Sequence, residues 1–161
     1  MIRSVTPSDA IAIAEIYNYY IANTTITFEV ESVSPEEIVG RMEKYSEIGP
    51  YLVYEDNGEV IGFTYVSRFR ERKAYEHTVE STIYLRNGSG GKGVGFELYS
   101  ELLSLVSLNY HSITAGIALP NEASIRLHEK CGFKKIGHFS EVGRKFGKWI
   151  DVGFWQKCGK G

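Results

Sequence analysis

Residues 78–95 read TVESTIYLRNGSGGKGVG, and this stretch decides the fold. Small or apolar residues occupy every second position from Val79 to Leu85, a pattern that predicts a strand over about 78–86. Five of the eight residues from Gly88 to Gly95 are glycine, and the segment after them predicts a helix through about residue 108. The sequence therefore predicts a strand, a glycine-rich loop and a helix in direct succession.

The glycine-rich loop has the chemistry of a pyrophosphate cradle. Glycine allows a positive φ and lets the backbone approach a ligand without a Cβ clash. Amides at the start of a helix point outward, at the positive end of the helix dipole. A merely flexible loop is the alternative interpretation, although the glycines ahead of this helix exceed what a turn needs.

Two common phosphate-binding motifs do not fit this loop. Residues 88–93 match the dinucleotide pattern GxGxxG, but residues 106–117, where that pattern expects an acidic residue for the ribose, contain none. A P-loop needs Ser or Thr after its lysine, whereas Gly93 follows Lys92.

The segments on either side of this stretch predict a mixed α/β (α+β) fold in one domain, residues 1–161. A short strand over 2–5 precedes a helix that Thr6 caps, and Ser34 caps a second helix that ends at Gly49-Pro50. Asn57-Gly58 between apolar runs predicts a hairpin. Beyond the central helix we expect a strand over 112–118, a short helix from Asn121 to Gly132, and strands over about 133–157.

Composition excludes several classes of protein. The net charge is −2 in 161 residues without a long basic run, so broad electrostatic binding to nucleic acid is not expected. No apolar run approaches the ~18 residues of a membrane span, and the first residues lead into a helix rather than a signal peptide. Cys131 and Cys158 form no CxxC pair, and the histidines lack zinc spacing, so we expect no metal and a cytoplasmic protein.

Several segments resemble the GNAT superfamily of N-acetyltransferases. Residues 91–95 (GKGVG) are similar to its acetyl-CoA loop, Gln/Arg-x-x-Gly-x-Gly/Ala, and residues 121–133 (NEASIRLHEKCGF) to its Asn-x-x-Ala/Ser … Glu-Lys-x-Gly-Phe helix. Residues 73–75 (KAY), 78–84 (TVESTIY) and 143–149 (GRKFGKW) look like the phosphinothricin acetyltransferase branch. The ordered set covers nearly the whole chain and is specific, whereas any one motif alone would be weak.

The resemblance implies a central, mostly antiparallel sheet flanked by helices, which splays beside the loop to admit the pantetheine arm of acetyl-CoA. Gly90 departs from the pattern, because the superfamily usually carries Gln or Arg there; the amides of residues 91–95 remain available to the pyrophosphate. The residues expected to bind acetyl-CoA are Ile83, Tyr84, Leu85, Gly90, Gly91, Lys92, Gly93, Val94, Gly95, Asn121 and Ser124.

Two residues are candidates for proton transfer. An amine must be neutral to form an amide, and a carboxylate at Glu80, on the strand that feeds the loop, can take its proton; the resemblance places a catalytic glutamate there. His128 stands where many relatives carry a tyrosine that protonates the departing thiolate, and imidazole titrates near neutrality. A strand acid in an ion pair and a packing histidine are the alternatives.

The resemblance also implies the acceptor site and its substrate. Arg72 matches a substrate-binding arginine whose guanidinium can hold an anion, and Arg70 and Lys73 lie beside it. Phe28, Tyr75 and Thr82 match further acceptor-site positions. We expect direct acetylation of a small amino-acid-like amine such as phosphinothricin or methionine sulfoximine, by a homodimer. An acetyltransferase of protein N-termini and a non-catalytic acyl-CoA-binding domain are the rival hypotheses.

Overall fold

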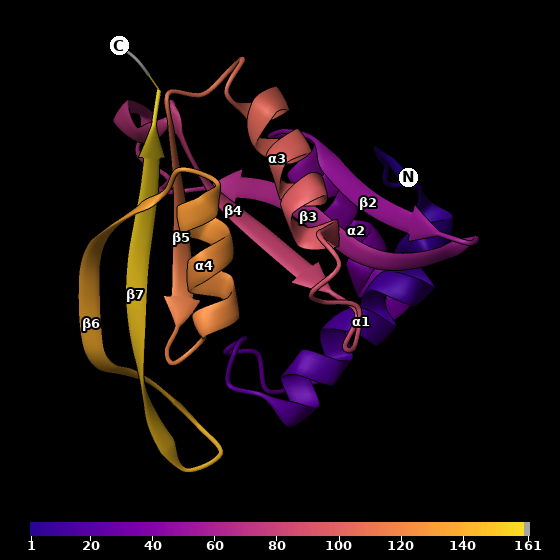
Figure 1. Cartoon of the computed structure of the whole chain (residues 1–161), viewed down its shortest axis with the longest axis horizontal. Coiled ribbons are helices and arrows are strands. Elements are labelled where there is room, and N and C mark those ends of the chain that lie inside the picture. The colour runs from indigo at the N-terminus through magenta and orange to yellow at the C-terminus, as the bar shows by residue number, and fades with distance from the viewer. Residues whose placement is uncertain (160–161) are drawn as a thin grey trace.

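The computed structural model describes residues 1–159, so the last two residues of the predicted domain lie outside it. Seven strands form one sheet in the order β1-β2-β3-β4-β5-β7-β6, in which only β4 and β5 run parallel. Figure 1 shows the sheet crossing the molecule between its helices. The strands are β1 (Ile2–Ser4), β2 (Tyr51–Asp56), β3 (Glu59–Arg68), β4 (Thr78–Leu85), β5 (Ser112–Ala118), β6 (Lys134–Lys145) and β7 (Lys148–Cys158).

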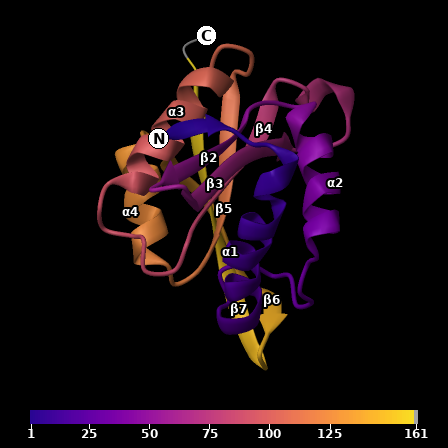
Figure 2. The same cartoon turned by 90° about the vertical axis from the view of Figure 1, so that its right-hand side faces the viewer.

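Helices cover both faces of the sheet. Figure 2 shows α1 and α2 on one face and α3 and α4 on the other, each face having its own buried apolar cluster. The helices are α1 (Ala10–Asn23), α2 (Pro35–Ser46), α3 (Val94–Val106) and α4 (Glu122–Lys130), with short 3₁₀ turns η1 (Pro7–Asp9) and η2 (Lys73–Tyr75). The mixed, mostly antiparallel sheet flanked by helices that the sequence predicted is confirmed.

Several predicted boundaries differ from the structure, and α2, for example, ends at Ser46, three residues before the expected Gly49. The first helix begins with the tighter turn η1, in which the Asp9 carboxylate accepts the Thr6 amide (2.8 Å) and the Arg3 guanidinium donates to it. The central helix α3 ends at Val106, two residues before the expected end. The predicted hairpin turn is present, because Asn57 and Gly58 have φ values of 51° and 79°, as a two-residue primed turn requires.

The sheet divides between β4 and β5. These strands share only three residue pairs, Thr78 with Ser112, Val79 with Ile113 and Glu80 with Thr114, and then diverge. Residues 81–85 of β4 and 115–118 of β5 consequently have no strand partner on the sides that face one another. We call this divergence the fork.

Hydroxyl groups hold the fork at its apex. Ser81 Oγ donates to the Thr114 carbonyl (3.1 Å) and lies 2.6 Å from the Tyr99 hydroxyl of α3. Thr114 Oγ1 donates to the Val79 carbonyl (3.3 Å). These buried contacts pin the point at which the two strands part.

Strands β6 and β7 extend beyond the rest of the sheet. β5 pairs with β7 only over residues 152–158, so β7 residues 148–150 pair with β6 alone. We call residues 139–151 the arm; Figure 1 shows it at the lower end of the molecule. Four of its large apolar side chains are more than half exposed, namely Phe139, Val142, Phe146 and Trp149, whereas Ile150 is buried.

Candidate active site

The glycine-rich loop after β4 has the backbone that a phosphate cradle needs. Gly88, Gly91 and Gly93 have φ values of 88°, 82° and 80°, in the left-handed region that favours glycine. A Cβ placed on Gly91 or Gly93 would meet no atom within 4 Å, so the space beside the loop is open. The loop can therefore receive a ligand against its main chain.

The start of α3 completes this cradle. Gly93 is the N-cap and no side chain caps the helix, so the amides of its first turn remain available at the positive end of the dipole. A Cβ on Gly95 would lie 3.3 Å from Leu85 Cδ1, so this glycine lets α3 pack closely on β4. Gly90 and Lys92 are exposed on the loop. Sequence reasoning found this site because its residues are contiguous.

The fork leaves open main-chain edges that lead from the cradle toward the centre of the sheet. Ile83 and Leu85 pack against the cluster under α3, and Tyr84 packs against the cluster under α1. The side chains of residues 83–85 are thus engaged in the two cores, while one edge of their main chain faces the fork. Main-chain edges bind amide-containing chains by strand-like hydrogen bonds, so these residues fit the amides of a pantetheine arm.

Glu80 lies where the fork opens. It is the last residue of β4 that pairs with β5, and its Oε1 is 3.8 Å from where a Cβ on Gly116 would be. Its side chain is partly buried, which raises the pKa of the carboxyl, and the nearby Arg70 guanidinium opposes this effect. A carboxylate whose pKa is raised toward neutrality is a better general base at physiological pH.

His128 does not have the setting of an acid. It is buried on α4, and its ring packs edge-on against Tyr99 and Phe133 at centroid distances of 5.0 and 5.3 Å. Its Nδ1 lies 2.7 Å from the Ser124 carbonyl, which can only accept, so Nδ1 carries the proton of the neutral ring. Burial lowers the pKa of the imidazole. This geometry favours a packing histidine, which was the alternative interpretation of the sequence.

Asn121 and Ser124 have structural partners of their own at the start of α4. Asn121 Oδ1 accepts the Ser124 amide (3.2 Å) as the N-cap of the helix, and Ser124 Oγ lies 3.3 Å from His128 Nδ1. The helix start is therefore ordered by these two residues. Their direct contact with acetyl-CoA stays a prediction.

The predicted acceptor residues come from three separate segments. Phe28, in the loop between α1 and α2, packs on Gly143 of the arm, whereas Tyr75 in η2 contacts the Phe69 ring (5.6 Å between centroids). Thr82 follows Glu80 on the same face of β4, and its carbonyl accepts the Thr64 hydroxyl (2.7 Å). Phe28 and Tyr75 are about 40% exposed, so both rings are available to a ligand.

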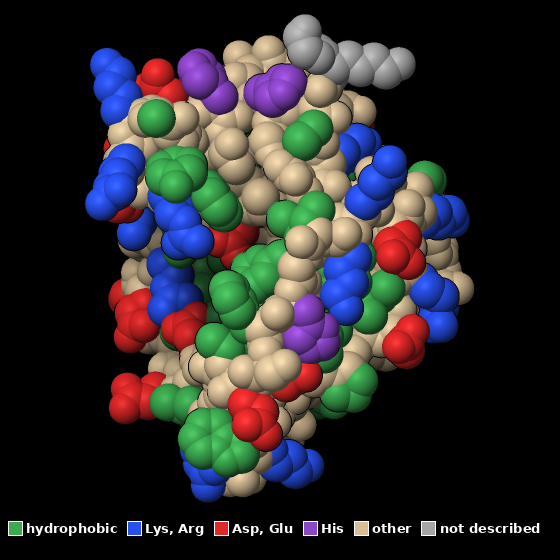
Figure 3. Space-filling view, turned by 90° about the vertical axis from the view of Figure 1, so that its left-hand side faces the viewer, with side chains coloured by type: hydrophobic (Ala, Val, Ile, Leu, Met, Phe, Trp, Pro, Cys, Tyr) green, Lys and Arg blue, Asp and Glu red, His purple; other side chains and the backbone are tan. Residues whose placement is uncertain are grey.

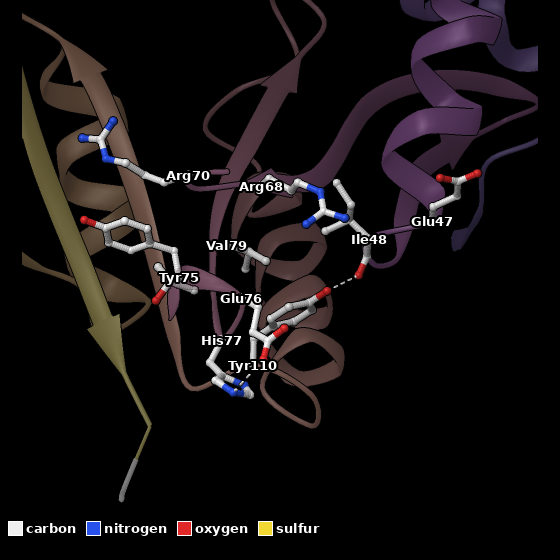
Figure 4. Close-up of a pocket in the computed structure, with 10 residues that line it drawn as sticks. Glu47, Ile48, Arg68, Arg70, Tyr75, Glu76, His77, Val79 and Tyr110 are labelled. Carbon is white, nitrogen blue, oxygen red and sulfur yellow. Dashed lines mark hydrogen bonds and ion pairs between the residues drawn. The ribbon is translucent and has the colours of Figure 1, made fainter. Parts of the chain in front are cut away.

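Arg72, the predicted acceptor-site cation, stays a prediction, and Arg70 is a second candidate for the same role. Both side chains are exposed, Arg72 at the start of η2 and Arg70 just before it, but Arg70 stacks on the Phe69 ring (4.8 Å) and affects the pKa of Glu80. Figure 4 shows the Arg70 guanidinium and the Tyr75 hydroxyl on the same side of a pocket. The sequence pointed to Arg72 by resemblance and left Arg70 open, because spacing alone does not tell which of two arginines in one loop turns toward the fork.

The pocket in Figure 4 is distinct from the glycine-rich cradle. It has a volume of about 320 Å³ and is lined by the start of β4 and by Arg68, Arg70, Tyr75 and Tyr110. The glycine-rich loop is at the other end of β4, so this pocket is not the cradle. Figure 3 shows a separate feature, a hollow ringed by hydrophobic side chains with Lys and Arg side chains beside it.

Within residues 1–159 no group of His, Cys, Asp and Glu is arranged to hold a metal ion. In the same residues, every helix is too short or too polar to cross a membrane.

Comparison with known proteins supports the interpretation of this site. The chain is 40% identical over 157 residues to phosphinothricin N-acetyltransferase of Streptomyces viridochromogenes, covering 97% of this chain and 86% of the relative. A GNAT superfamily phosphinothricin acetyltransferase from Sinorhizobium meliloti in complex with acetyl-CoA superposes with a TM-score of 0.95 at 36% identity, covering 100% and 89% of the two chains. A ribosomal-protein-alanine N-acetyltransferase from Brucella melitensis gives 0.94 at 34% identity, covering 98% and 99%.

The family model of the acetyltransferase (GNAT) domain matches residues 2–153, which span the cradle, the fork and the whole arm. The match includes the residues predicted to bind acetyl-CoA and those predicted to bind the acceptor. The resemblance that the motifs suggested is confirmed. The chain belongs to the GNAT family of acetyl-CoA-dependent N-acetyltransferases.

Proposed function

We propose that this chain transfers the acetyl group of acetyl-CoA to the α-amine of a small amino-acid-like acceptor, such as phosphinothricin or methionine sulfoximine. One observation carries the proposal. A partly buried carboxylate, Glu80, lies at the apex of a fork whose open main-chain edges lead to a phosphate cradle. The Streptomyces viridochromogenes relative is named for the N-acetylation of phosphinothricin, which supports an amino-acid-like acceptor.

The proposed chemistry is direct transfer. Glu80 takes a proton from the ammonium group of the acceptor, and the neutral amine attacks the thioester carbonyl. A carbon–nitrogen bond forms, the nitrogen loses a second proton to solvent, the carbon–sulfur bond breaks, and the released thiolate is protonated by solvent. His128 has no part in this scheme, because the Nδ1 proton of its neutral ring is already donated to the Ser124 carbonyl.

The acceptor would be oriented by one cation and two aromatic rings. Arg70 lies close enough to Glu80 to affect its pKa, so an anionic group held by Arg70 would leave the α-amine near the carboxylate. The exposed rings of Phe28, in the loop between α1 and α2, and Tyr75, in η2, offer two apolar walls. Holding the amine in place turns a bimolecular encounter into a nearly intramolecular step.

We also propose that the protein acts in the cytoplasm as a homodimer of single-domain chains. The two free thiols, Cys131 and Cys158, suit a reducing compartment. The exposed apolar side chains of the arm offer a surface for a second copy. Analytical ultracentrifugation of the purified chain tests the dimer directly, and a monomer at micromolar concentration would contradict it.

A thiol-release assay with acetyl-CoA tests the main proposal. The panel contains free amino acids, phosphinothricin, methionine sulfoximine, their carboxylate esters, and peptides with an N-terminal alanine. We expect the free acids to be acetylated with the highest kcat/KM. The Brucella melitensis structure motivates the peptides, and peptides used faster than every free acid would favour an acetyltransferase of protein N-termini. Binding of acetyl-CoA without release of thiol on any amine would favour a non-catalytic domain.

A further inference from the structure

Lys145 is an ammonium group in an unusual place. It is 4% exposed at the end of β6, and its Nζ donates to the Thr27 carbonyl at 2.9 Å, across 118 residues of sequence. Within residues 1–159 no carboxylate lies within 4.0 Å of it, and burial lowers the pKa of its amine. Its Nζ also lies 5.1 Å from the centre of the Phe146 ring, and the nearby Glu29 carboxylate opposes the lowering of its pKa. Burying a charge without a direct ion-pair partner is nevertheless costly, and the bond to the Thr27 carbonyl is the direct polar contact that offsets this cost.

The two neighbours of Phe28 are both held in place. The Thr27 carbonyl accepts a hydrogen bond from Lys145 Nζ, and the Thr27 hydroxyl lies 2.8 Å from the Tyr17 hydroxyl. Glu29 accepts the Tyr17 hydroxyl and both terminal nitrogens of Arg41, at 2.7 and 2.8 Å. The backbone on each side of Phe28 is thus anchored, while the Phe28 side chain stays 42% exposed.

The arm is shaped to receive the Phe28 ring. A Cβ on Gly143 would lie 2.3 Å from the ring, so only glycine leaves room for it. Gly143 and Lys145 are two residues apart on one strand and therefore point to the same face. One supplies the space for the ring and the other ties down the segment that carries it.

We propose that Lys145 is a positioning residue for the acceptor, which fixes Phe28 as a rigid wall by joining the loop between α1 and α2 to the arm. The inference rests on the proposed function, because it takes Phe28 to contact the acceptor. It assigns a role to residues 143–149, which the donor site and Glu80 leave without one. It also explains why a charge is buried at this point: an ammonium group aimed at a main-chain carbonyl fixes the loop whatever the loop's side chains are.

Steady-state kinetics of Lys145→Met test the proposal, since Met keeps the length of the side chain and removes the donor. We expect the KM for the acceptor to rise about 10-fold or more, while kcat and the KM for acetyl-CoA change less than about twofold. Lys148→Met is the matched control, because Lys148 pairs with Lys145 across the hairpin but is exposed. An unchanged acceptor KM in folded Lys145→Met would overturn the proposal.

A second variant approaches the junction from the other side and leaves the lysine in place. Gly143→Ala displaces the Phe28 ring and should raise the acceptor KM in the same way. Gly137→Ala on the same strand adds a methyl group where nothing lies within 4 Å, so it should change nothing. If Lys145→Met fails to fold, equal acceptor KM values for Gly143→Ala and Gly137→Ala would overturn the proposal.

Two measurements separate this proposal from the failure of the proposed function. In a Phe28→Ala background Lys145→Met should add less than about twofold to the acceptor KM, because both changes remove the same wall; fully additive effects would contradict a role through Phe28. Hydrogen exchange of the Phe28 and Glu29 amides, measured without substrate, should quicken in Lys145→Met and not in Lys148→Met. Unchanged exchange would overturn the junction even if the acceptor proves to be of another class.

Discussion

The two halves of this active site are built in opposite ways. The donor half is made of main chain from one stretch, residues 83–95, and three glycines with positive φ shape it. The acceptor half is made of side chains from the loop between α1 and α2, the segment from Arg70 to Tyr75, β4 and the arm. The first half tolerates few side chains because it uses the backbone, and the second depends on how distant segments pack. Substitutions should therefore act on the donor half by adding atoms and on the acceptor half by removing them.

The largest effect should come from adding a charged side chain to the cradle. Gly93→Asp puts a carboxylate where a phosphate would lie, and like charges at close range cost several kcal/mol, so the affinity for acetyl-CoA should fall by more than about 100-fold. No atom lies within 4 Å of the new Cβ, so the fold should survive the cost of about 1–2 kcal/mol for a left-handed residue. Isothermal titration calorimetry measures the loss, and circular dichroism checks the fold.

Gly90 provides the control for this substitution. It lies on the same loop without a positive φ, and a Cβ there also meets nothing within 4 Å. Gly90→Ala should therefore bind acetyl-CoA like the wild type. Equal losses from both variants would show that general loop disorder, and not the cradle at Gly93, sets the affinity.

Removing the proposed base should have the next largest effect. Glu80→Gln keeps the shape of the side chain but cannot take the proton, and kcat at pH 7 should fall by ~10²–10⁴-fold with little change in acetyl-CoA affinity. The loss should shrink at alkaline pH, where more of the acceptor amine is already neutral. Wild-type kcat in this variant would show that Glu80 is structural.

The pH profile gives an independent check on the same residue. The pKa of Glu80 is raised by burial, so the carboxyl becomes protonated at a higher pH than an exposed glutamate does. The wild-type kcat/KM should accordingly fall as the pH drops through that raised pKa, because the base is lost. In Glu80→Gln this acidic limb should be absent, leaving only the titration of the acceptor amine.

The two arginines of the acceptor half should differ. Arg70→Ala should raise the acceptor KM by about 10- to 100-fold, because a charge-assisted hydrogen bond contributes about 1.5–3 kcal/mol. Arg72→Ala should raise it by less than about threefold, as expected if the anion is held by Arg70, whose charge reaches Glu80. Initial rates with a free acid and with its ester measure the difference. The opposite ranking would restore Arg72, the arginine that the sequence favoured, as the anion clamp.

The smallest catalytic effect should come from His128. His128→Asn should lower kcat by less than about fivefold, because solvent can protonate the thiolate. It should instead lower the free energy of unfolding by about 1–3 kcal/mol through the lost contacts with Tyr99 and Phe133. Urea denaturation measures this term. A loss of kcat above 100-fold in a stable variant would make His128 catalytic after all.

What could be predicted from the sequence follows the same division. Local patterns predicted the Asn57-Gly58 turn, the glycine-rich loop and the start of α3, because each depends on neighbours in the chain. Periodicity placed His128 on a helix face but could not show that Tyr99 and Phe133 enclose it. The Lys145 contact joins residues 118 apart, and no local pattern encodes such a distance. The choice between Arg70 and Arg72 likewise depends on how their loop folds over β4.

The fork has a consequence for the lifetime of the protein. Nine residues of β4 and β5, 81–85 and 115–118, lack a strand partner on the side that faces the fork. A donor substrate bound along the edges of the fork, as proposed, would complete the sheet as a missing strand does. A ligand that binds only the folded state stabilises it by about 2.7 kcal/mol at 100 times its Kd. Resistance to proteolysis should therefore rise with the supply of acetyl-CoA, and the abundance of the enzyme would report the acetyl supply of the cell that makes it.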